Sequence, residues 1–463
     1  MPQTFTVYNP YDLKAIKELQ LHSKQEAFEM LDRAKTAFED PSQTLSPSTR
    51  LSILKKLIEL ITLEQEDFSL LIAQEGGKPL RDARVEAARA ISGVEKAIEA
   101  IGSLAGQEIP MNLNPASEGK QAFTIREAIG PVLAISAFNH PLNLIIHQAI
   151  PAIAAGCPVI VKPALTTPLS CIRLIELIQQ AGLPESHCQV CLCEDQIAEE
   201  MAASPQISFL SFIGSAKIGW KLKSQVAPGV HCLLEHGGIA PVIIDETADL
   251  DSLIPKILKG AFYHAGQVCV SVQRVYAPKA IAHDLAKKLS TEAQKLIVGS
   301  AENSKTDIGP IIKTTELKRI ENWVAEAIKE GAELLCGGQA LSESTYPATV
   351  LFNPQDHSKV SKEEIFGPVL SVYSYDHIDE AIERANDTKA CFQAAIFTEN
   401  IKTAFKASRE LKATAVMIND HTAFRVDWMP FGGRSNSGYG IGGIAQTVQE
   451  LSPEKLIVFN FNP

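Results

Sequence analysis

The sequence predicts an α/β protein built on two doubly wound, largely parallel sheets. From Gly130 onward, short apolar runs typical of buried strands alternate with segments of helical periodicity, as in β-α-β units. A second series of the same kind runs from Pro241 to about Thr422. The chain has 463 residues, which exceeds one ordinary core and predicts more than one domain.

The region before the alternation is predicted to be helical. Between Ser48 and Leu104, apolar residues recur at helix spacing, beginning with Leu51, Leu54, Leu57, Ile58 and Ile61. The run Gly76-Gly77-Lys78-Pro79 interrupts this pattern, because glycine and proline are poor residues for a helix interior.

Strands and helices are expected in regular order after Gly130. The predicted strands are 132–136, 158–161, 188–192, 207–213 and 232–234, and the predicted helices are 144–155 and 168–181. Residues 109–126 look like an excursion from this order, and 456–461 form an apolar strand with no partner nearby in sequence. An exposed strand edge needs covering, so we expect the chain to self-associate.

Composition excludes several classes of function. A net charge of −11 argues against nucleic acid as a partner, because phosphates favour a basic face. No stretch of about 18 residues is apolar enough to predict a membrane span, and Met1 to Asp12 lacks the pattern of a secretory signal. Nine cysteines, an odd number, fit a reducing compartment, so the expected location is the cytoplasm.

Three of these cysteines invite a metal-site interpretation. Cys188 and Cys191 have CxxC spacing, and Cys193 follows them. A zinc site needs further ligands, typically a second close pair, and none follows. The segment is better interpreted as a short buried strand in which thiols act as small hydrophobic groups, and no metal is predicted.

Three residues have the chemistry for acyl transfer. Cys269 supplies a thiol nucleophile, and Glu235 supplies a carboxylate that can deprotonate a water. Asn139, at the end of a predicted strand, offers an amide to a developing oxyanion. Taken singly, each has an ordinary explanation: a buried cysteine, a surface glutamate and a turn asparagine.

Eight segments, in this order and at these separations, resemble the aldehyde dehydrogenase superfamily over nearly the whole chain. They are Phe138-Asn139-His140-Pro141, Val161-Lys162-Pro163-Ala164, Phe212-Ile213-Gly214-Ser215, Glu235-His236-Gly237-Gly238, Phe262 to Cys269, Asp307-Ile308-Gly309-Pro310, Glu364-Ile365-Phe366-Gly367-Pro368 and Pro430-Phe431-Gly432-Gly433 with Ser437-Gly438. The resemblance implies an NAD(P)-binding domain of residues 1–108 and 131–237 and a catalytic domain of residues 238–441. Residues 109–130 and 442–463 would form a small β element that joins homodimers or homotetramers.

The resemblance also implies a reaction. Cys269 would attack an aldehyde to give a thiohemiacetal, hydride would pass to NAD or NADP, and Glu235 would drive hydrolysis of the thioester. Such a base has to be movable or partly buried, because an ordinary carboxylate is too weak a base near neutral pH. The implied cofactor residues are Lys162 and Glu364 for the two riboses, Gly214 and Ser215 for the pyrophosphate, and Phe366 beside the nicotinamide ribose.

Three positions depart from the family pattern. Leu165 stands three residues after Lys162, where many NAD-specific relatives have a glutamate that binds the adenosine 2′-hydroxyl. This departure leaves the choice between NAD and NADP open. His236 replaces the usual leucine, and Phe138 stands where tryptophan is common, but neither change removes a reacting group.

The substrate residues are a hypothesis. We expect His140, Arg425 and Phe431 to line the substrate pocket, with Arg425 and His140 favouring a short aldehyde that has an anionic or hydroxylated end. In the alternative, Arg425 pairs with Asp427 or another acid as part of the scaffold.

Other functions remain to be separated from the leading one. A related enzyme would pass the acyl group to coenzyme A, which does not need Glu235 as a base. A catalytically silent homologue would act as a binding protein, but should have lost Cys269, Glu235 or Asn139. A metal-dependent redox protein would contain bound zinc or iron.

Overall fold

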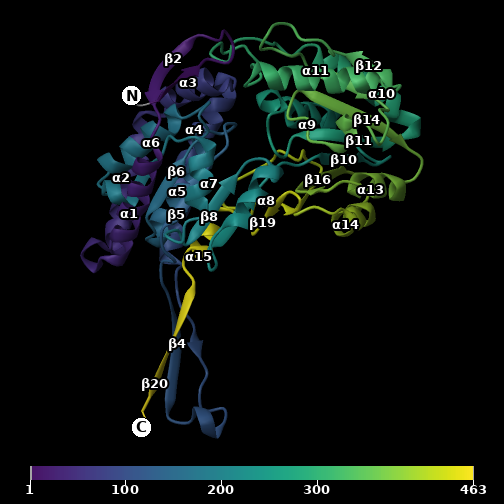
Figure 1. Ribbon diagram of the computed structural model, residues 1–463. Helices are drawn as coiled ribbons and strands as arrows, with labels where there is room; N and C mark the ends of the chain where they lie inside the picture. Colours follow the sequence, from purple (N-terminus) through teal and green to yellow (C-terminus); the bar gives the residue numbers. More distant parts are fainter. Residues whose placement is uncertain (1–2, 462–463) are drawn as a thin grey trace.

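The computed structural model describes residues 3–461 and shows two α/β lobes with a long β extension beneath one of them (Figure 1). The first lobe, purple to teal, contains residues from the N-terminal half, and the second lobe, green, contains residues from 240 onward. This arrangement confirms the predicted fold class of two α/β domains with a β element.

The first lobe contains a six-stranded sheet in the order β19-β9-β8-β5-β6-β7. Its strands are β5 (Val132–Ile135), β6 (Val159–Lys162), β7 (Cys188–Val190), β8 (Phe209–Ile213), β9 (His231–Glu235) and β19 (Gly438–Tyr439). All pairs are parallel except β19 with β9. The chain runs from β5 outward through β6 to β7, then returns to the other side of β5 at β8. In such sheets ligands bind where the strand order reverses, outside the carboxyl ends of the strands.

Helices cover this sheet and fill its core. The helices between its strands are α5 (Asn143–Ala155), α6 (Leu169–Gln180), α7 (Asp195–Ala202) and α8 (Ala216–Gln225). The predicted strands and helices of this region are therefore confirmed, with ends that differ by a few residues. Cys188, Cys191 and Cys193 are buried, and Cys188 begins β7, as the strand interpretation predicted.

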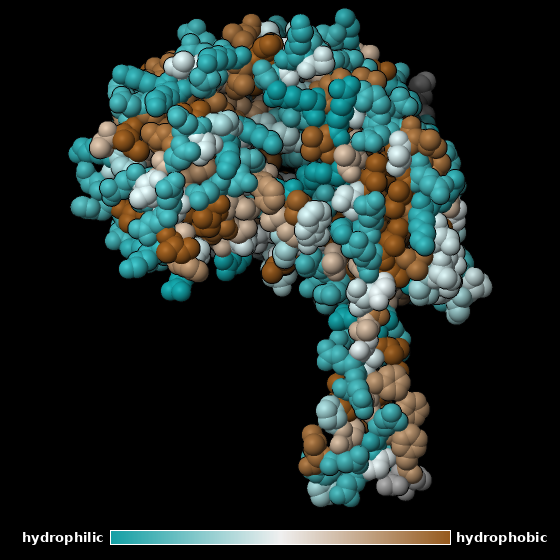
Figure 2. All heavy atoms as spheres, turned by 180° about the vertical axis from the view of Figure 1, so that it is seen from behind, coloured by the Kyte–Doolittle hydropathy of each residue, from teal (hydrophilic) through white to brown (hydrophobic). Residues whose placement is uncertain are grey.

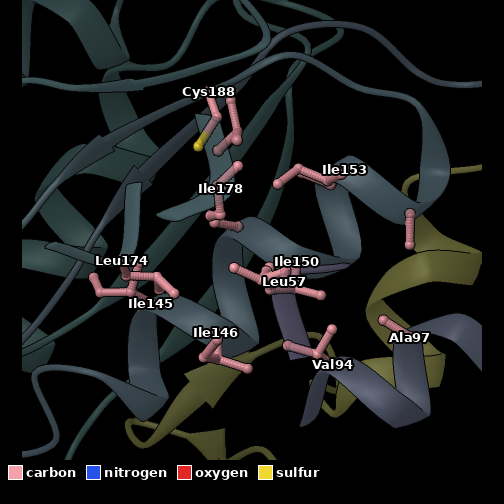
Figure 3. Close-up of a cluster of buried hydrophobic side chains, with 14 of the residues drawn as sticks. Leu57, Val94, Ala97, Ile145, Ile146, Ile150, Ile153, Leu174, Ile178 and Cys188 are labelled. Atoms are coloured by element: carbon pink, nitrogen blue, oxygen red, sulfur yellow. The ribbon is translucent and has the colours of Figure 1, made fainter. Parts of the chain in front are cut away.

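The N-terminal helices form one side of the same core. The region predicted to be helical, from Ser48 to Leu104, forms the helices α2 (Pro47–Leu63), α3 (Gln65–Gly76) and α4 (Leu80–Gly102). Figure 3 shows side chains of α2, α4, α5 and α6 meeting there, among them Leu57, Val94 and Ile150, all fully buried. Each such aliphatic side chain contributes about 1.5–3 kcal/mol on burial.

The predicted break after α3 is present, because Gly77 adopts φ 68° and ends the helix. The end of α2 before Glu64 was not predicted. Also not predicted are helix α1 (Lys24–Glu39) and the hairpin of β1 (Thr4–Tyr8) and β2 (Ala15–Gln20).

The second lobe contains a seven-stranded sheet in the order β12-β13-β14-β11-β10-β16-β17, in which only the β12–β13 pair is antiparallel. Its strands are β10 (Ala240–Ile244), β11 (Val272–Pro278), β12 (Glu333–Cys336), β13 (Thr349–Phe352), β14 (Val369–Tyr375), β16 (Gln393–Phe397) and β17 (Ala415–Ile418). Its helices are α9 (Leu250–Phe262), α10 (Lys279–Ala293), α11 (Thr314–Lys329), α12 (Lys359–Lys362), α13 (Ile378–Asn386) and α14 (Ile401–Glu410). A two-residue pair, β15 (Ala390–Cys391) with β18 (Arg434–Ser435), lies beside it.

The excursion and the C-terminal strand pair with each other. Strand β20 (Glu454–Asn460) runs antiparallel to β4 (Lys120–Arg126), and β3 (Glu108–Ile109) lies on the other side of β4. Figure 2 shows the extension standing away from the body, with hydrophobic residues along one side. Helix α15 (Ile444–Glu450), which precedes β20, is not part of the extension, because Ile444 and Val448 are fully buried against the core of the first lobe.

No helix among residues 3–461 combines the length and the apolar character needed to cross a membrane.

Candidate active site

A cavity of about 980 Å³ opens at the carboxyl ends of the strands in the first sheet and is also lined by loops of the second lobe. The terminal residues of β5, β6, β8 and β9 all line it. All eleven predicted site residues lie on its wall. They are Asn139, His140, Lys162, Gly214, Ser215, Glu235, Cys269, Glu364, Phe366, Arg425 and Phe431.

A strained turn presents Cys269 to the cavity. Helix α9 is followed by a short 3₁₀ segment (Tyr263–Gly266), in which His264, Ala265 and Gly266 adopt φ of 48°, 54° and 69°. Three left-handed residues in a row reverse the chain sharply, and such strain persists only where surrounding contacts enforce it. The side chain of Gln267 supplies these contacts. Its Nε2 donates to the Pro310 carbonyl at 3.2 Å, and its Oε1 accepts from the backbone N–H of Ile312 at 3.0 Å.

The Cys269 thiol is half-buried and protonated at neutral pH. Burial raises its pKa well above the usual range, and the carboxyl groups of Glu364 and Glu235 raise it further. Arg425 acts in the opposite direction. A thiol in this setting would have to lose its proton in order to attack a carbonyl carbon, and a nearby cation would lower the cost of that step.

Glu235 ends β9 and has the properties expected of a general base near neutral pH. Its side chain is buried, and this burial raises its pKa to about 7, although Arg425 opposes the shift. A side chain at Gly442 would overlap the Glu235 carboxyl group, so glycine there leaves it room. Burial is one of the two conditions, mobility or partial burial, that the sequence analysis set for a base at this position, and the Glu235 side chain meets it.

Asn139 lies just beyond the end of β5 and reaches across to the loop that carries Cys269. Its amide nitrogen donates a hydrogen bond to the Gln267 carbonyl at 2.9 Å. A carboxamide nitrogen has two N–H groups, so one remains for an oxyanion beside Cys269. The side chain is 5 % exposed, which favours a fixed orientation.

One end of the cavity fits a dinucleotide. Ser215 precedes α8 and makes no side-chain capping bond, so the first N–H groups of the helix are available to an anion. Gly214 donates to the Glu235 carbonyl at 3.0 Å, which holds this turn against β9. Lys162 lies within 2.7 Å of Asp195.

Glu364 and Phe366 occupy the part of this wall nearer the thiol. The Glu364 carboxylate accepts from the Gly238 amide at 3.2 Å, and burial raises its pKa to about 7. The Phe366 ring packs edge-on against Phe138, with ring centroids 5.8 Å apart. A side chain at Gly237 would overlap Glu364, so glycine at this position keeps that carboxylate beside the cavity.

Another part of the cavity wall carries a half-buried cation. The Arg425 guanidinium lies 3.5 Å from the centre of the Phe431 ring and donates to Nδ1 of His147 at 3.2 Å. Its Nε is buried without a hydrogen-bond partner. Burial lowers its pKa to about 10, so it remains charged at neutral pH.

The scaffold alternative for Arg425 is not what the structure shows. Asp427 instead accepts two bonds from Arg89, at 2.7 and 3.2 Å, and one from His147 at 2.9 Å. Burial disfavours a charged Asp427, but these bonds from His147 and Arg89 outweigh it and lower its pKa. His140, by contrast, is neutral, because burial and nearby cations lower its pKa far below the usual value.

Comparison with known proteins establishes the family. A model of the aldehyde dehydrogenase family matches residues 1–457. The chain belongs to the aldehyde dehydrogenase family. The assignment made from the eight sequence segments is therefore confirmed.

Its relatives span almost the full chain. It is 36% identical to a 3-sulfolactaldehyde dehydrogenase of Priestia aryabhattai over 456 residues, which cover 98% of this chain and 94% of the relative. It is 34% identical to a lactaldehyde dehydrogenase of Methanococcus maripaludis over 462 residues, with 98% and 97% covered.

Solved structures agree with these relatives. Aldehyde dehydrogenase 21 from Physcomitrella patens, in complex with the reaction product succinate, superposes with a TM-score of 0.96 at 31% identity and covers 100% of this chain and 96% of that one. Glyceraldehyde-3-phosphate dehydrogenase GapN from Methanocaldococcus jannaschii, complexed with NADP, superposes with a TM-score of 0.94 at 32% identity, and the match covers 99% of both chains.

Arg89 and His147, which both bond to Asp427 beside Arg425 in this aldehyde dehydrogenase's cavity, were not predicted from the sequence. Arg89 comes from α4 and His147 from α5, and both line the wall beside Arg425. The available signal was Asn143 and His147, two polar residues one helical turn apart in a segment whose other residues, except Gln148, are apolar. Within residues 3–461, no cluster of three or more His, Cys, Asp or Glu side chains is arranged to hold a metal.

Proposed function

We propose that this aldehyde dehydrogenase oxidises a short aldehyde with an anionic or hydroxylated end to the carboxylic acid, using NAD or NADP. The observation that carries the proposal is that one cavity contains a thiol, a carboxyl group with a raised pKa, an amide donor and a half-buried, charged arginine. Relatives named for 3-sulfolactaldehyde and lactaldehyde, and a structure containing succinate, support a small polar substrate.

In the proposed first half-reaction, the Cys269 sulfur bonds to the aldehyde carbon, and the thiol proton is released to solvent through the open cavity. The carbonyl electron pair becomes an oxyanion, which Asn139 and the backbone N–H of Cys269 stabilise. Loss of one such donor typically costs about 3 kcal/mol. Bound NAD(P) supplies the hydride acceptor, and the carbon held on Cys269 is left as a thioester.

In the proposed second half-reaction, Glu235 removes a proton from water as the water oxygen bonds to the thioester carbon. The carbon–sulfur bond then breaks, which restores Cys269 and releases the acid. Glu235 is suited to this step because a base whose pKa lies near the working pH is both ionised and basic enough. Transfer to coenzyme A would not require this base.

We propose residue roles at the cofactor end on the same basis. Gly214 and Ser215 would hold the pyrophosphate, Lys162 and Glu364 the two riboses, and Phe366 would lie beside the nicotinamide ribose. Residues 1–108 and 131–237 would then form the cofactor-binding domain, and residues 238–441 the catalytic domain.

An absorbance assay at the reduced-nicotinamide band tests the function. A panel of short neutral, hydroxylated and anionic aldehydes is measured with NAD and with NADP, each with and without coenzyme A, and the products are identified. We expect free acid at the same rate with and without coenzyme A. Strict dependence on coenzyme A would support the acyl-transferring alternative, and no turnover with any aldehyde would contradict the proposal.

Arg425→Ala is expected to change substrate preference. Hydrogen bonds to charged groups are worth about 1.5–3 kcal/mol, so the ratio of kcat/KM for an anionic aldehyde to that for acetaldehyde should fall by about ten- to a hundredfold. Arg409→Ala is a suitable control, because Arg409 also stacks on a ring, that of Phe405, but on the surface of α14. An unchanged ratio in Arg425→Ala would exclude this role.

We propose that the extension joins two or four copies of the chain. Strand β20 exposes about half of Leu456, Val458 and Phe459, which form an apolar edge. In sedimentation, wild type should exceed the monomer mass, and Val458→Lys should shift it toward monomer. Leu63→Lys, at an exposed position on α2, should have no effect. A monomeric wild type would contradict the proposal.

We also propose a cytoplasmic location. All nine cysteines are free, and seven of them are buried. A reducing compartment fits this state.

A further inference from the structure

We propose that Asp195 makes this enzyme select NAD over NADP. Its carboxylate would accept a hydrogen bond from the 2′-hydroxyl of the adenosine ribose and would repel a 2′-phosphate at that position. The inference rests on the proposed function, because it takes the adenosine ribose to lie beside Lys162.

An ion pair on the cavity wall carries the inference. Nζ of Lys162 lies 2.7 Å from Oδ1 of Asp195. The Lys162 side chain is 6 % exposed and the Asp195 side chain 89 % exposed, so a buried amine is joined to a carboxylate that remains open to a ligand. Both residues line the cavity.

The topology explains why an acid from a distant part of the sequence reaches this position. Lys162 ends β6, and Asp195 begins α7, shortly after the neighbouring parallel strand β7. The carboxyl ends of parallel strands meet at one edge of a sheet, which brings the two residues together. Leu165 lines the same wall but has no carboxylate. Asp195, which lies in the connection that follows β7, therefore supplies the negative charge that residue 165 lacks.

The charge balance at this end disfavours a phosphate. Among the cavity-lining residues between 135 and 237, Lys162 is the single lysine or arginine, whereas three residues, Asp195, Glu199 and Glu235, are acidic. The Glu199 carboxylate is engaged by Lys221, at 2.6 and 2.7 Å. A 2′-phosphate would bring a charge of about −2 toward a lysine whose charge Asp195 already balances. A ribose hydroxyl, which can donate, fits a carboxylate acceptor.

The test compares the binding of NADH and NADPH to the full-length protein, measured by the fluorescence of the bound reduced nicotinamide. Wild type should bind NADH at least about tenfold more tightly, since opposing like charges is costly. Asp195→Asn keeps the shape of the side chain and removes its charge. This variant should lower the ratio of the Kd for NADPH to the Kd for NADH by about tenfold. The ratio of kcat/KM with NADH to kcat/KM with NADPH should fall in parallel.

Glu194→Gln is the matched control. Glu194 adjoins Asp195, is exposed and accepts a bond from Gln3 at 2.8 Å, but does not line the cavity. It should leave the Kd ratio unchanged. Adding Leu165→Glu to Asp195→Asn should restore preference for NADH, because a carboxylate then returns to the same wall.

The outcomes separate this inference from the proposed function. If wild type prefers NADPH, or if Asp195→Asn keeps the wild-type ratio, Asp195 does not select the nucleotide, although the enzyme still oxidises aldehydes. If wild type binds neither nucleotide, the proposed function fails and this inference fails with it.

Discussion

Cys269→Ser is expected to reduce aldehyde oxidation by more than about a thousandfold, because loss of a catalytic nucleophile removes the covalent route entirely. A serine hydroxyl has a far higher pKa than a thiol, and this cavity already raises the pKa of the thiol. The rate of reduced nicotinamide formation measures the loss. Nucleotide binding should be retained, because the residues assigned to the cofactor are untouched.

Cys232→Ser is the control for this prediction. Cys232 and Cys269 are the two cysteines of the described chain that are not fully buried, but Cys232 lies on β9 and does not line the cavity. Cys232→Ser should keep the wild-type rate, and a thiol-alkylating reagent should inactivate both wild type and Cys232→Ser. A Cys269→Ser enzyme with near wild-type turnover would disprove the covalent mechanism.

The site was largely predictable because its residues stand at strand ends. Asn139, Lys162, Gly214 and Glu235 each follow or end a strand of one parallel sheet, and the carboxyl ends of such strands share one edge. The alternation of apolar runs was therefore enough to place these four residues at one edge of the first sheet, but not the second-lobe loops that carry Cys269 and Glu364. The order of the motifs supplied the family, and the family supplied the roles.

The substrate end was less predictable because its contacts join distant segments of the sequence. Asp427 lies two residues from Arg425, which made an ion pair between them a reasonable alternative. In the fold, Asp427 bonds to Arg89 and His147, which are 338 and 280 residues away. Periodicity places a residue on a face of its own helix, but it does not say which loop will pack against that face.

These bonds fix the position of the Arg425 guanidinium on the cavity wall. Asp427 holds Nε2 of His147, whose Nδ1 then accepts from Arg425. The pKa of His147 is lowered to about 4, chiefly by burial, so the ring is neutral and can accept at neutral pH. The guanidinium held in this way opposes the rise in the pKa of both Glu235 and Cys269, so the residue that we propose recognises the substrate would also affect the two proposed reacting groups.

Glu235→Gln is expected to separate the two half-reactions. The amide has the shape of the carboxyl group but cannot remove a proton from water, so the acyl group should remain on Cys269. General-base catalysis is typically worth about 10²–10⁴-fold, and steady-state turnover should fall by about this factor. Rapid mixing should still show one equivalent of reduced nicotinamide per active site, and intact-mass spectrometry should detect the acylated enzyme.

The pH dependence identifies which buried carboxyl group is the base. Burial raises the pKa of both Glu235 and Glu364 to about 7. The base must be ionised, so deacylation should be slow below pH 7, rise through about pH 7 and level off above it. If Glu235 is the base, Glu235→Gln removes this rise, whereas Glu364→Gln weakens nucleotide binding, keeps the rise and accumulates no acyl-enzyme. The reverse pattern, with the rise lost only in Glu364→Gln, would assign the proton transfer to Glu364 instead.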